Sequence, residues 1–151
     1  MLESTREGAP PIDLRRLVAV EKQMGVELPD SYRRFLLAYN GGRPTPAYFT
    51  SAENGRIVWM RIHFFFGVDD EIEGCDLLWH YRTFKQRLPR NVIAIANDEG
   101  GNLFCLDLRS GGDGRILFWD HELEEAGFDV ASKVIVASSF DGWLAQLSSR
   151  A

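Results

Sequence analysis

The pattern of hydrophobic and polar positions in residues 91–121 predicts three β-strands joined by two tight turns. The predicted strands are three mainly apolar runs, at residues 92–96, 103–108 and 115–120. The segments between them, Asn97–Gly101 and Ser110–Gly114, are rich in Asn, Asp and Gly, which accept the left-handed backbone that tight turns require. Successive strands with such short connections predict an antiparallel meander.

Apolar residues at helical spacing precede and follow this meander. Residues 12–24 predict a helix that stops at Gly25, and residues 29–39 predict a second that ends at Asn40-Gly41-Gly42. Residues 76–87 predict a third helix, and a closing helix begins after Ser138 or Ser139.

The stretch between the second and third helices alternates apolar and polar residues, as a strand does. Residues 56–66 put Val58, Met60, Ile62 and Phe64 on one face, which we expect to be the core face. Glu53-Asn54-Gly55 predicts the preceding hairpin turn, residues 43–51 predict a loop with an edge strand at Tyr48-Phe49, and residues 133–137 predict a short final strand. Together these elements predict an α+β fold.

The length of 151 residues predicts one domain with a substantial core. The polar residues 1–9 predict a flexible N-terminus, which leaves residues 10–151 as the domain. The chain contains no apolar run long enough to cross a bilayer, and its first residues lack the basic start and apolar centre of a signal peptide. We therefore expect a cytoplasmic protein that does not insert into membranes.

The sequence predicts no catalytic residue and no cofactor-binding site. The two Gly-rich turns are not followed by the Lys of a phosphate-binding loop. Cys105 lies in the middle of a predicted core strand, where a nucleophile would lack access and a positioned base. We expect Cys75 and Cys105 to be reduced and buried, although the sequence leaves a disulfide between them open.

The histidines predict no metal site. His63, His80 and His121 fall on different predicted elements, whereas a zinc ion needs three or four converging ligands. Asp120, His121 and Glu122 form the best cluster, but neighbouring side chains of an extended chain point in different directions. We expect His121 to be an exposed residue at a strand end.

Charge is the strongest remaining signal, because residues 97–151 hold 10 Asp/Glu and only 4 Lys/Arg. An acidic surface repels nucleic acid and attracts a cationic protein partner. Alternate turns of a meander lie at one end of the sheet, so the segments Asp98–Glu99 and Asp120–Glu125 should share an edge. Whether the acidic segment Asp69–Glu73 lies near this edge stays open from the sequence. The candidate partner-binding residues are Asp69, Asp70, Glu71, Glu73, Asp98, Glu99, Asp120 and Glu122.

Three blocks of the chain resemble the SUKH superfamily, which includes fungal cell-wall-assembly regulators and many bacterial immunity proteins. The blocks are EKQMGVELPDSYRRFLLAYNGG at residues 21–42, IANDEGGN at residues 95–102 with FWDHE at residues 118–122, and VASSFDGWL at residues 136–144. The resemblance implies N-terminal helices and a C-terminal helix packed on a curved, mainly antiparallel sheet. It also implies a non-catalytic immunity protein that occludes a cognate bacterial toxin, often a nuclease.

Two other functions stay open from the sequence. The first is a cytoplasmic regulatory or scaffold module that binds an endogenous protein, as the cell-wall regulators of the superfamily do. The second is a small hydrolase that uses Asp98 or the Asp120-His121 pair. The recognised blocks are mainly structural, so they name neither the partner nor the oligomeric state.

Overall fold

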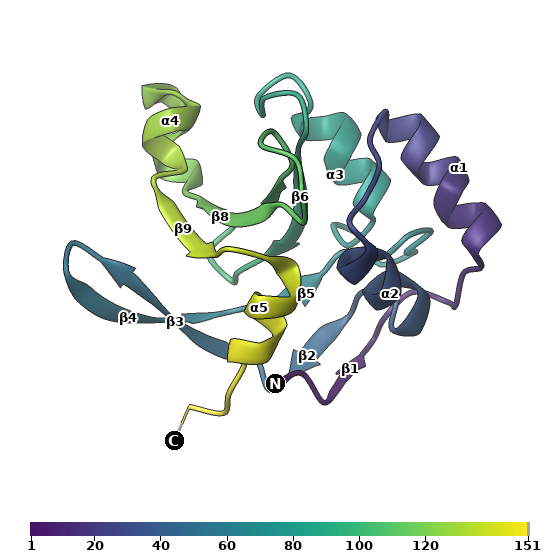
Figure 1. The fold of residues 1–151 in the computed structure, drawn as a ribbon, viewed down its shortest axis with the longest axis horizontal. Coiled ribbons are helices and arrows are strands. Elements are labelled where there is room, and N and C mark those ends of the chain that lie inside the picture. Colours follow the sequence, from purple (N-terminus) through teal and green to yellow (C-terminus); the bar gives the residue numbers. More distant parts are fainter. Residues whose placement is uncertain (151) are drawn as a thin grey trace.

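The structure is a computed structural model, and it describes residues 1–150 (Figure 1). Its elements in chain order are β1 (Ser4–Arg6), α1 (Leu14–Met24), α2 (Asp30–Ala38), β2 (Arg43–Thr45), β3 (Tyr48–Glu53), β4 (Arg56–Arg61), β5 (Phe64–Phe65), α3 (Leu77–Phe84), β6 (Val92–Asn97), β7 (Leu103–Asp107), β8 (Arg115–Trp119), the 3₁₀ helix η1 (His121–Ala126), α4 (Phe128–Ala131), β9 (Val134–Ala137) and α5 (Phe140–Gln146). The α+β class predicted from the sequence is confirmed.

A five-stranded antiparallel sheet in the order β5-β6-β7-β8-β9 forms the centre of the molecule. The predicted meander is its middle, β6-β7-β8, with Leu103 opposite Asn97 on one side and Trp119 on the other. The helices surround this curved sheet, with α1 and α3 toward one side and α5 toward the other (Figure 1).

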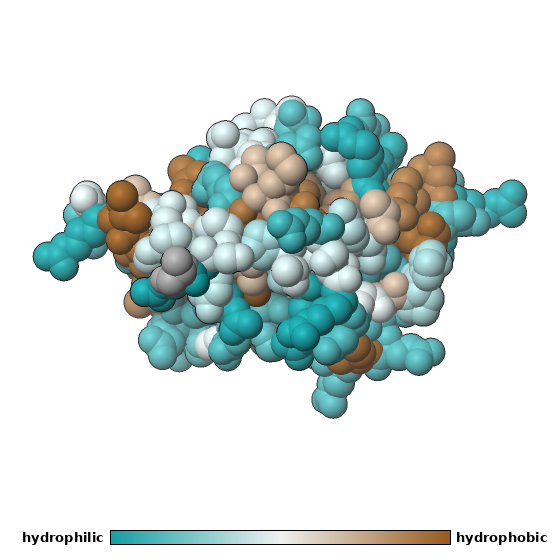
Figure 2. Space-filling model, turned by 90° about the horizontal axis from the view of Figure 1, so that it is seen from below, coloured by the Kyte–Doolittle hydropathy of each residue, from teal (hydrophilic) through white to brown (hydrophobic). Residues whose placement is uncertain are grey.

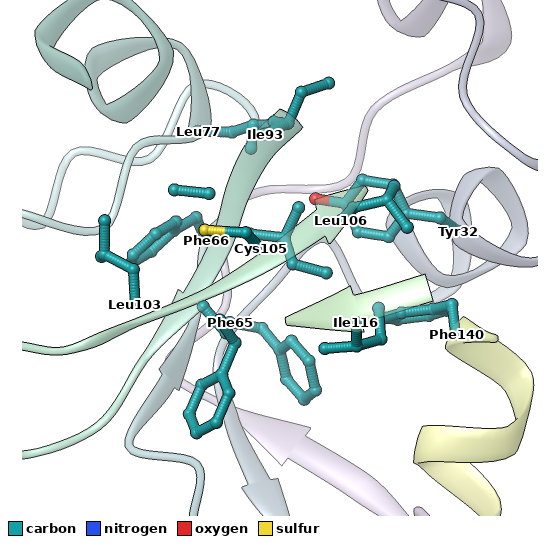
Figure 3. Packing of buried hydrophobic residues seen from close by; sticks show 14 of the residues in the cluster. Tyr32, Phe65, Phe66, Leu77, Ile93, Leu103, Cys105, Leu106, Ile116 and Phe140 are labelled. Atoms are coloured by element: carbon teal, nitrogen blue, oxygen red, sulfur yellow. The ribbon is translucent and has the colours of Figure 1, made fainter. Parts of the chain in front are cut away.

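Aromatic residues fill the face of the sheet that α2 and α5 cover. Phe65 of β5 and Phe104 of β7 contact Trp143 of α5, with ring centroids 5.4 and 5.2 Å apart. Tyr32 of α2 packs edge-on against Phe140 of α5 at 5.0 Å, and Figure 3 shows this part of the core. These side chains are at most 2% exposed, so this face is a dry core.

The opposite face of the sheet is covered by α3. Phe66 stacks on His80 with ring centroids 3.6 Å apart, and Phe84 contacts Trp119 at 5.8 Å. Cys105 points into this layer, near Phe66 and Leu103 (Figure 3). Because both faces are buried, the central strands are apolar on both sides rather than alternating.

The predicted strand over residues 56–66 is divided in the structure. Its first part, β4, pairs with β3 in a separate two-stranded sheet, and its second part, β5, pairs with β6. The β3–β4 hairpin projects beyond the central sheet (Figure 1), and its turn has positive φ at Asn54 (51°) and Gly55 (77°). The four residues of the predicted core face are half-buried at the outer end and buried at the inner end.

Part of the N-terminal segment predicted to be flexible forms a strand. Ser4–Arg6 pairs antiparallel with Arg43–Thr45, and the amide of Glu3 donates to the carbonyl of Thr45 at 2.9 Å. The polar composition gave no sign of this pairing, because the partner strand lies almost 40 residues away in the chain. The proposed boundary at residue 10 stays a prediction.

Residues 1–150 contain neither a membrane-spanning helix nor a disulfide. No helix in this range is both long and apolar enough to span a bilayer. Cys75 and Cys105 are buried and free, so no disulfide joins them.

Candidate partner-binding groove

A groove lies between the projecting hairpin and the neighbouring end of the central sheet. It consists of two adjoining hollows, of about 340 and 400 Å³. The two hollows share four lining residues: Glu53, Val58, Met60 and Phe118. One hollow extends toward α4 and the other toward the turn between β6 and β7.

The floor of the groove is apolar. Val58 and Met60 from β4 face Phe118 from β8, and each of these side chains is half-buried. Leu123 and Val130 extend the apolar lining toward η1 and α4, and Leu123 is 43% exposed. Figure 2 shows hydrophobic surface at the left end of the molecule, the side to which the β3–β4 hairpin projects in Figure 1. Ile57 on this hairpin is 78% exposed.

The rim of the groove is mainly acidic. Four carboxylates line it, from the hairpin, the β6–β7 turn and the end of β8: Glu53, Asp98, Glu99 and Asp120. Two cationic side chains, Arg61 and Lys133, are also present. Arg61 forms an ion pair with Glu99 across the base of the hairpin.

Asp98 organises the turn between β6 and β7. Its carboxylate accepts hydrogen bonds from the amides of Gly100 and Asn102 and from the Asn102 side chain, each at 2.9 Å. Asp and Asn favour turns because their side chains bind nearby backbone in this way. The conformation of Asp98 is therefore set by the turn, and a substitution there would alter the backbone as well as the charge.

The β6–β7 turn and the end of β8 lie at one edge of the sheet, as the meander predicted. The amide of His121 donates to Asn102 Oδ1 at 3.1 Å, and His121 Nε2 lies 2.9 Å from the Gly100 carbonyl. Asp120 caps η1 by accepting from the Glu122 amide at 3.0 Å. The exposed Glu122 lies beside this edge without lining either hollow.

The other acidic segment, Asp69–Glu73, lies elsewhere. Strand β5 starts with Phe64 opposite Asn97 and runs away from the β6–β7 turn, because it is antiparallel to β6. Beyond β5, the segment Asp69–Glu73 lies beside the earlier helix α1, where Arg16 donates to both carboxylate oxygens of Asp69 at 2.7 and 2.9 Å. The predicted acidic surface is thus two surfaces, and only one borders the groove.

The acids of this second surface differ from one another. The Arg16 hydrogen bond lowers the pKa of Asp69, whereas burial raises the pKa of Asp70. Glu71 and Glu73 are exposed, and both contribute negative charge to this surface.

The three tryptophans Trp59, Trp79 and Trp119 differ in their burial. Trp119 is 2% exposed, whereas Trp59 on the hairpin is 43% and Trp79 on α3 is 51% exposed. Glu53, Ile57 and the residues of the groove floor were not among the partner-binding residues predicted from the sequence. The sequence contains one sign of this exposed surface, the apolar run Ile57–Met60 beside a hairpin turn. A short hairpin cannot bury both of its faces, so part of such an apolar run stays exposed.

The two thiols are buried, and polar side chains beside the groove bind backbone groups. Burial raises the pKa of Cys75 to about 11 and raises that of Cys105 further, so both thiols are neutral at pH 7. Asp98 and Asp120 serve as caps of backbone amides, and His121 binds a backbone carbonyl. Within residues 1–150, no three His, Cys, Asp or Glu side chains are grouped to hold a metal ion.

The fold and this site define an α+β domain with an exposed groove that has an apolar floor and a mainly acidic rim. The chain belongs to the SMI1 / KNR4 family (SUKH-1), whose family model matches residues 11–146. Members of the SUKH families are often toxin immunity proteins, and the family is generally non-enzymatic.

The chain is also similar to a protein of Bacillus subtilis and to a solved structure from Pseudomonas syringae. The chain is 29% identical over 152 residues to the SPbeta prophage-derived uncharacterized protein YokK of Bacillus subtilis (strain 168), covering 87% of this chain and 72% of that protein. It also matches a crystal structure of a protein from Pseudomonas syringae pv. tomato, with a TM-score of 0.49 and 20% identity, over 78% of this chain and 74% of that one.

Proposed function

We propose that this protein is a non-catalytic, cytoplasmic immunity protein that neutralises a cognate bacterial toxin by occluding it. The toxin is a cationic protein domain, such as a nuclease, and the groove between the β3–β4 hairpin and the central sheet is its docking site. The main support for this proposal is that one groove combines an apolar floor with a mainly acidic rim. Membership of the SUKH-1 family supports the same function.

The two features of the groove have different physical roles. Apolar burial at Val58, Met60 and Phe118 supplies affinity, at about 25 cal/mol per Å² removed from water. The rim carboxylates accelerate encounter with a basic partner and disfavour acidic ones. A nuclease has a basic surface because it binds phosphates, so an acidic inhibitor competes for the same surface.

The proposal is tested by reversing charge at the rim while keeping the turn intact. Glu53→Lys combined with Glu99→Lys changes the rim at two exposed residues that do not cap backbone amides. Glu71→Lys combined with Glu73→Lys is the matched control, because it makes the same change in net charge on the other acidic surface. Each form is used as bait in lysate of the native cells at low and at high salt.

We expect wild type and the Glu71/Glu73 control to retain a cationic protein at low salt and to release most of it at high salt. The Glu53/Glu99 variant should retain at least about tenfold less, and it should fail to protect cells that express the captured toxin. Loss in the control variant alone would move the docking site to the Asp69–Glu73 surface. Recovery of housekeeping proteins only would favour a regulatory or scaffold module.

A further inference from the structure

The outer edge of β4 carries backbone groups without a strand partner. Residues 1–150 place β4 in a two-stranded sheet with β3 alone, so one of its two edges is open. Val58, Trp59, Met60 and Arg61 all line the hollow beside the β6–β7 turn. Four consecutive strand residues alternate between faces, so a hollow that touches all four lies at the edge of the strand.

The hairpin register shows which backbone groups point to this edge. Positive φ at both Asn54 and Gly55 is a type I′ turn, which makes Glu53 and Arg56 a hydrogen-bonded pair. Hydrogen-bonded and non-hydrogen-bonded pairs then alternate, so Val58 and Met60 bond to β3. The amides and carbonyls of the intervening residues point the other way: Ile57, Trp59 and Arg61.

Two observed hydrogen bonds support this assignment. The amide of Ile62 donates to Ala47 on the β3 side at 3.0 Å, as the alternation requires. The amide of His63, next in the odd-numbered series, donates to Asn97 of β6 at 2.8 Å. The open edge of β4 is therefore continuous with the edge that β5 uses to pair with β6.

This edge lacks the features that usually prevent strand addition. Natural edge strands carry prolines, bulges or inward charges. Residues 57–60 are Ile-Val-Trp-Met, pair with β3 without a register shift, and carry charges only at the flanking Arg56 and Arg61. With Ile57 78% exposed, the strand presents apolar side chains and free backbone groups together.

We infer that an extended segment of a cationic partner adds to the open edge of β4 as a further strand, with basic and apolar residues alternating. The inference rests on the proposed function and specifies how the partner occupies the groove. Backbone hydrogen bonds to Ile57, Trp59 and Arg61 supply affinity, and alternate side chains supply specificity. Apolar side chains contact Val58 and Met60, and basic ones approach the acidic rim.

Charge favours this occupant over a second copy of the chain. Two copies each carry a net charge of −5 and repel one another. Pairing of two β4 edges would also bring two acidic rims together. A basic segment is favoured instead, because the four rim carboxylates outnumber the two cations that line the groove, Arg61 and Lys133, with Arg56 at the flank of β4.

Amide hydrogen exchange measured by NMR tests the inference, with an alternating Lys-Val peptide of about eight residues as the probe, long enough to span β4. In the free protein, the amides of Ile57 and Trp59 should exchange fast and those of Val58 and Met60 slowly. The Lys-Val peptide should slow the two fast amides by at least about tenfold. An alternating Glu-Val peptide should leave them fast.

Two variants at one position separate the backbone from the side chain. Ile57→Pro removes an outward amide that β3 does not use, a position where an edge strand tolerates proline. Ile57→Thr removes most of the apolar surface and keeps the amide. We expect proline to abolish the slowed exchange of Trp59 and threonine to retain it, while slow exchange at Val58 and Met60 shows that the hairpin is folded.

Three results would overturn strand addition. They are unchanged exchange at Ile57 and Trp59 with saturating Lys-Val peptide, equal effects of the Lys-Val and Glu-Val peptides, and slowing without peptide that increases with protein concentration, which would assign the edge to a second copy. Each is distinguishable from failure of the proposed function, because the rim variants and the native-cell bait experiment do not depend on the peptide.

Discussion

Replacement of Asp107 by Asn should destabilise the protein in a strongly pH-dependent way. Asp107 ends β7, and its side chain is 2% exposed. Its carboxylate accepts from Arg109 at 2.9 and 3.0 Å and from Arg115, directly across the β7–β8 pair, at 2.9 Å. Burial by itself raises the pKa of Asp107, but these hydrogen bonds and charges outweigh it and lower the pKa to about 2.

The size of the effect follows from this pKa. A decrease from 3.8 to about 2 corresponds to about 2.5 kcal/mol of stability for the ionised form, at about 1.4 kcal/mol per unit. The side chains of Arg109 and Arg115 are 35% and 43% exposed, so water screens part of the interaction and we expect a loss of about 2 kcal/mol. Because the folded pKa is depressed, this stability is present above about pH 4 and is lost as the pH falls toward 2.

Urea unfolding of wild type and Asp107→Asn at pH 7 and pH 2.5 measures the effect. The variant should be about 2 kcal/mol less stable at pH 7, a decrease in Tm of about 4–8 °C, and the difference should shrink by at least about half at pH 2.5. Asp113→Asn removes the same charge from an exposed position in the following turn and should change stability by less than about 0.5 kcal/mol. An equal loss for Asp107→Asn at both pH values would refute the electrostatic explanation.

Three further predictions concern buried residues that do not line the groove. Burial lowers the pKa of His80, so the unfolded chain binds a proton before the folded one and stability should fall as the pH drops below about 6.5. Urea unfolding of His80→Phe should show a flatter pH dependence in this range, and an unchanged slope would assign the pH dependence to other groups. Asn40→Ala removes the two hydrogen bonds of the Asn40 side chain with the amide and the carbonyl of Val68, at 2.8 and 2.9 Å, and should lower the free energy of urea unfolding by about 2–4 kcal/mol. A loss below about 1 kcal/mol would show that water replaces these hydrogen bonds. Gly41→Ala places a Cβ 2.7 Å from a backbone nitrogen, whereas the equally left-handed Gly25 faces open space, so thermal unfolding should show a clearly larger loss for Gly41→Ala than for Gly25→Ala.

The local features of this protein were predictable from its sequence. The turns predicted at residues 97–101 and 110–114 and the end of α1 at Gly25 follow from Asn, Asp and Gly, whose backbone preferences act over a few neighbouring residues. The meander followed from three apolar runs with short connections. Even the shared edge of Asp98 and His121 followed, because alternate turns of a meander lie at the same end of the sheet.

Only the tertiary structure decided what these local elements enclose. One apolar stretch, residues 56–66, is split between a projecting hairpin and the central sheet, and only this split creates the groove and the open edge of β4. The acids of residues 69–73 lie near α1 because β5 carries the chain away from the groove. Trp59 and Trp119 lie in strands of similar composition, yet one is exposed and the other buried. Burial depends on which distant segments pack against a residue, and residues close in sequence carry little information about that packing.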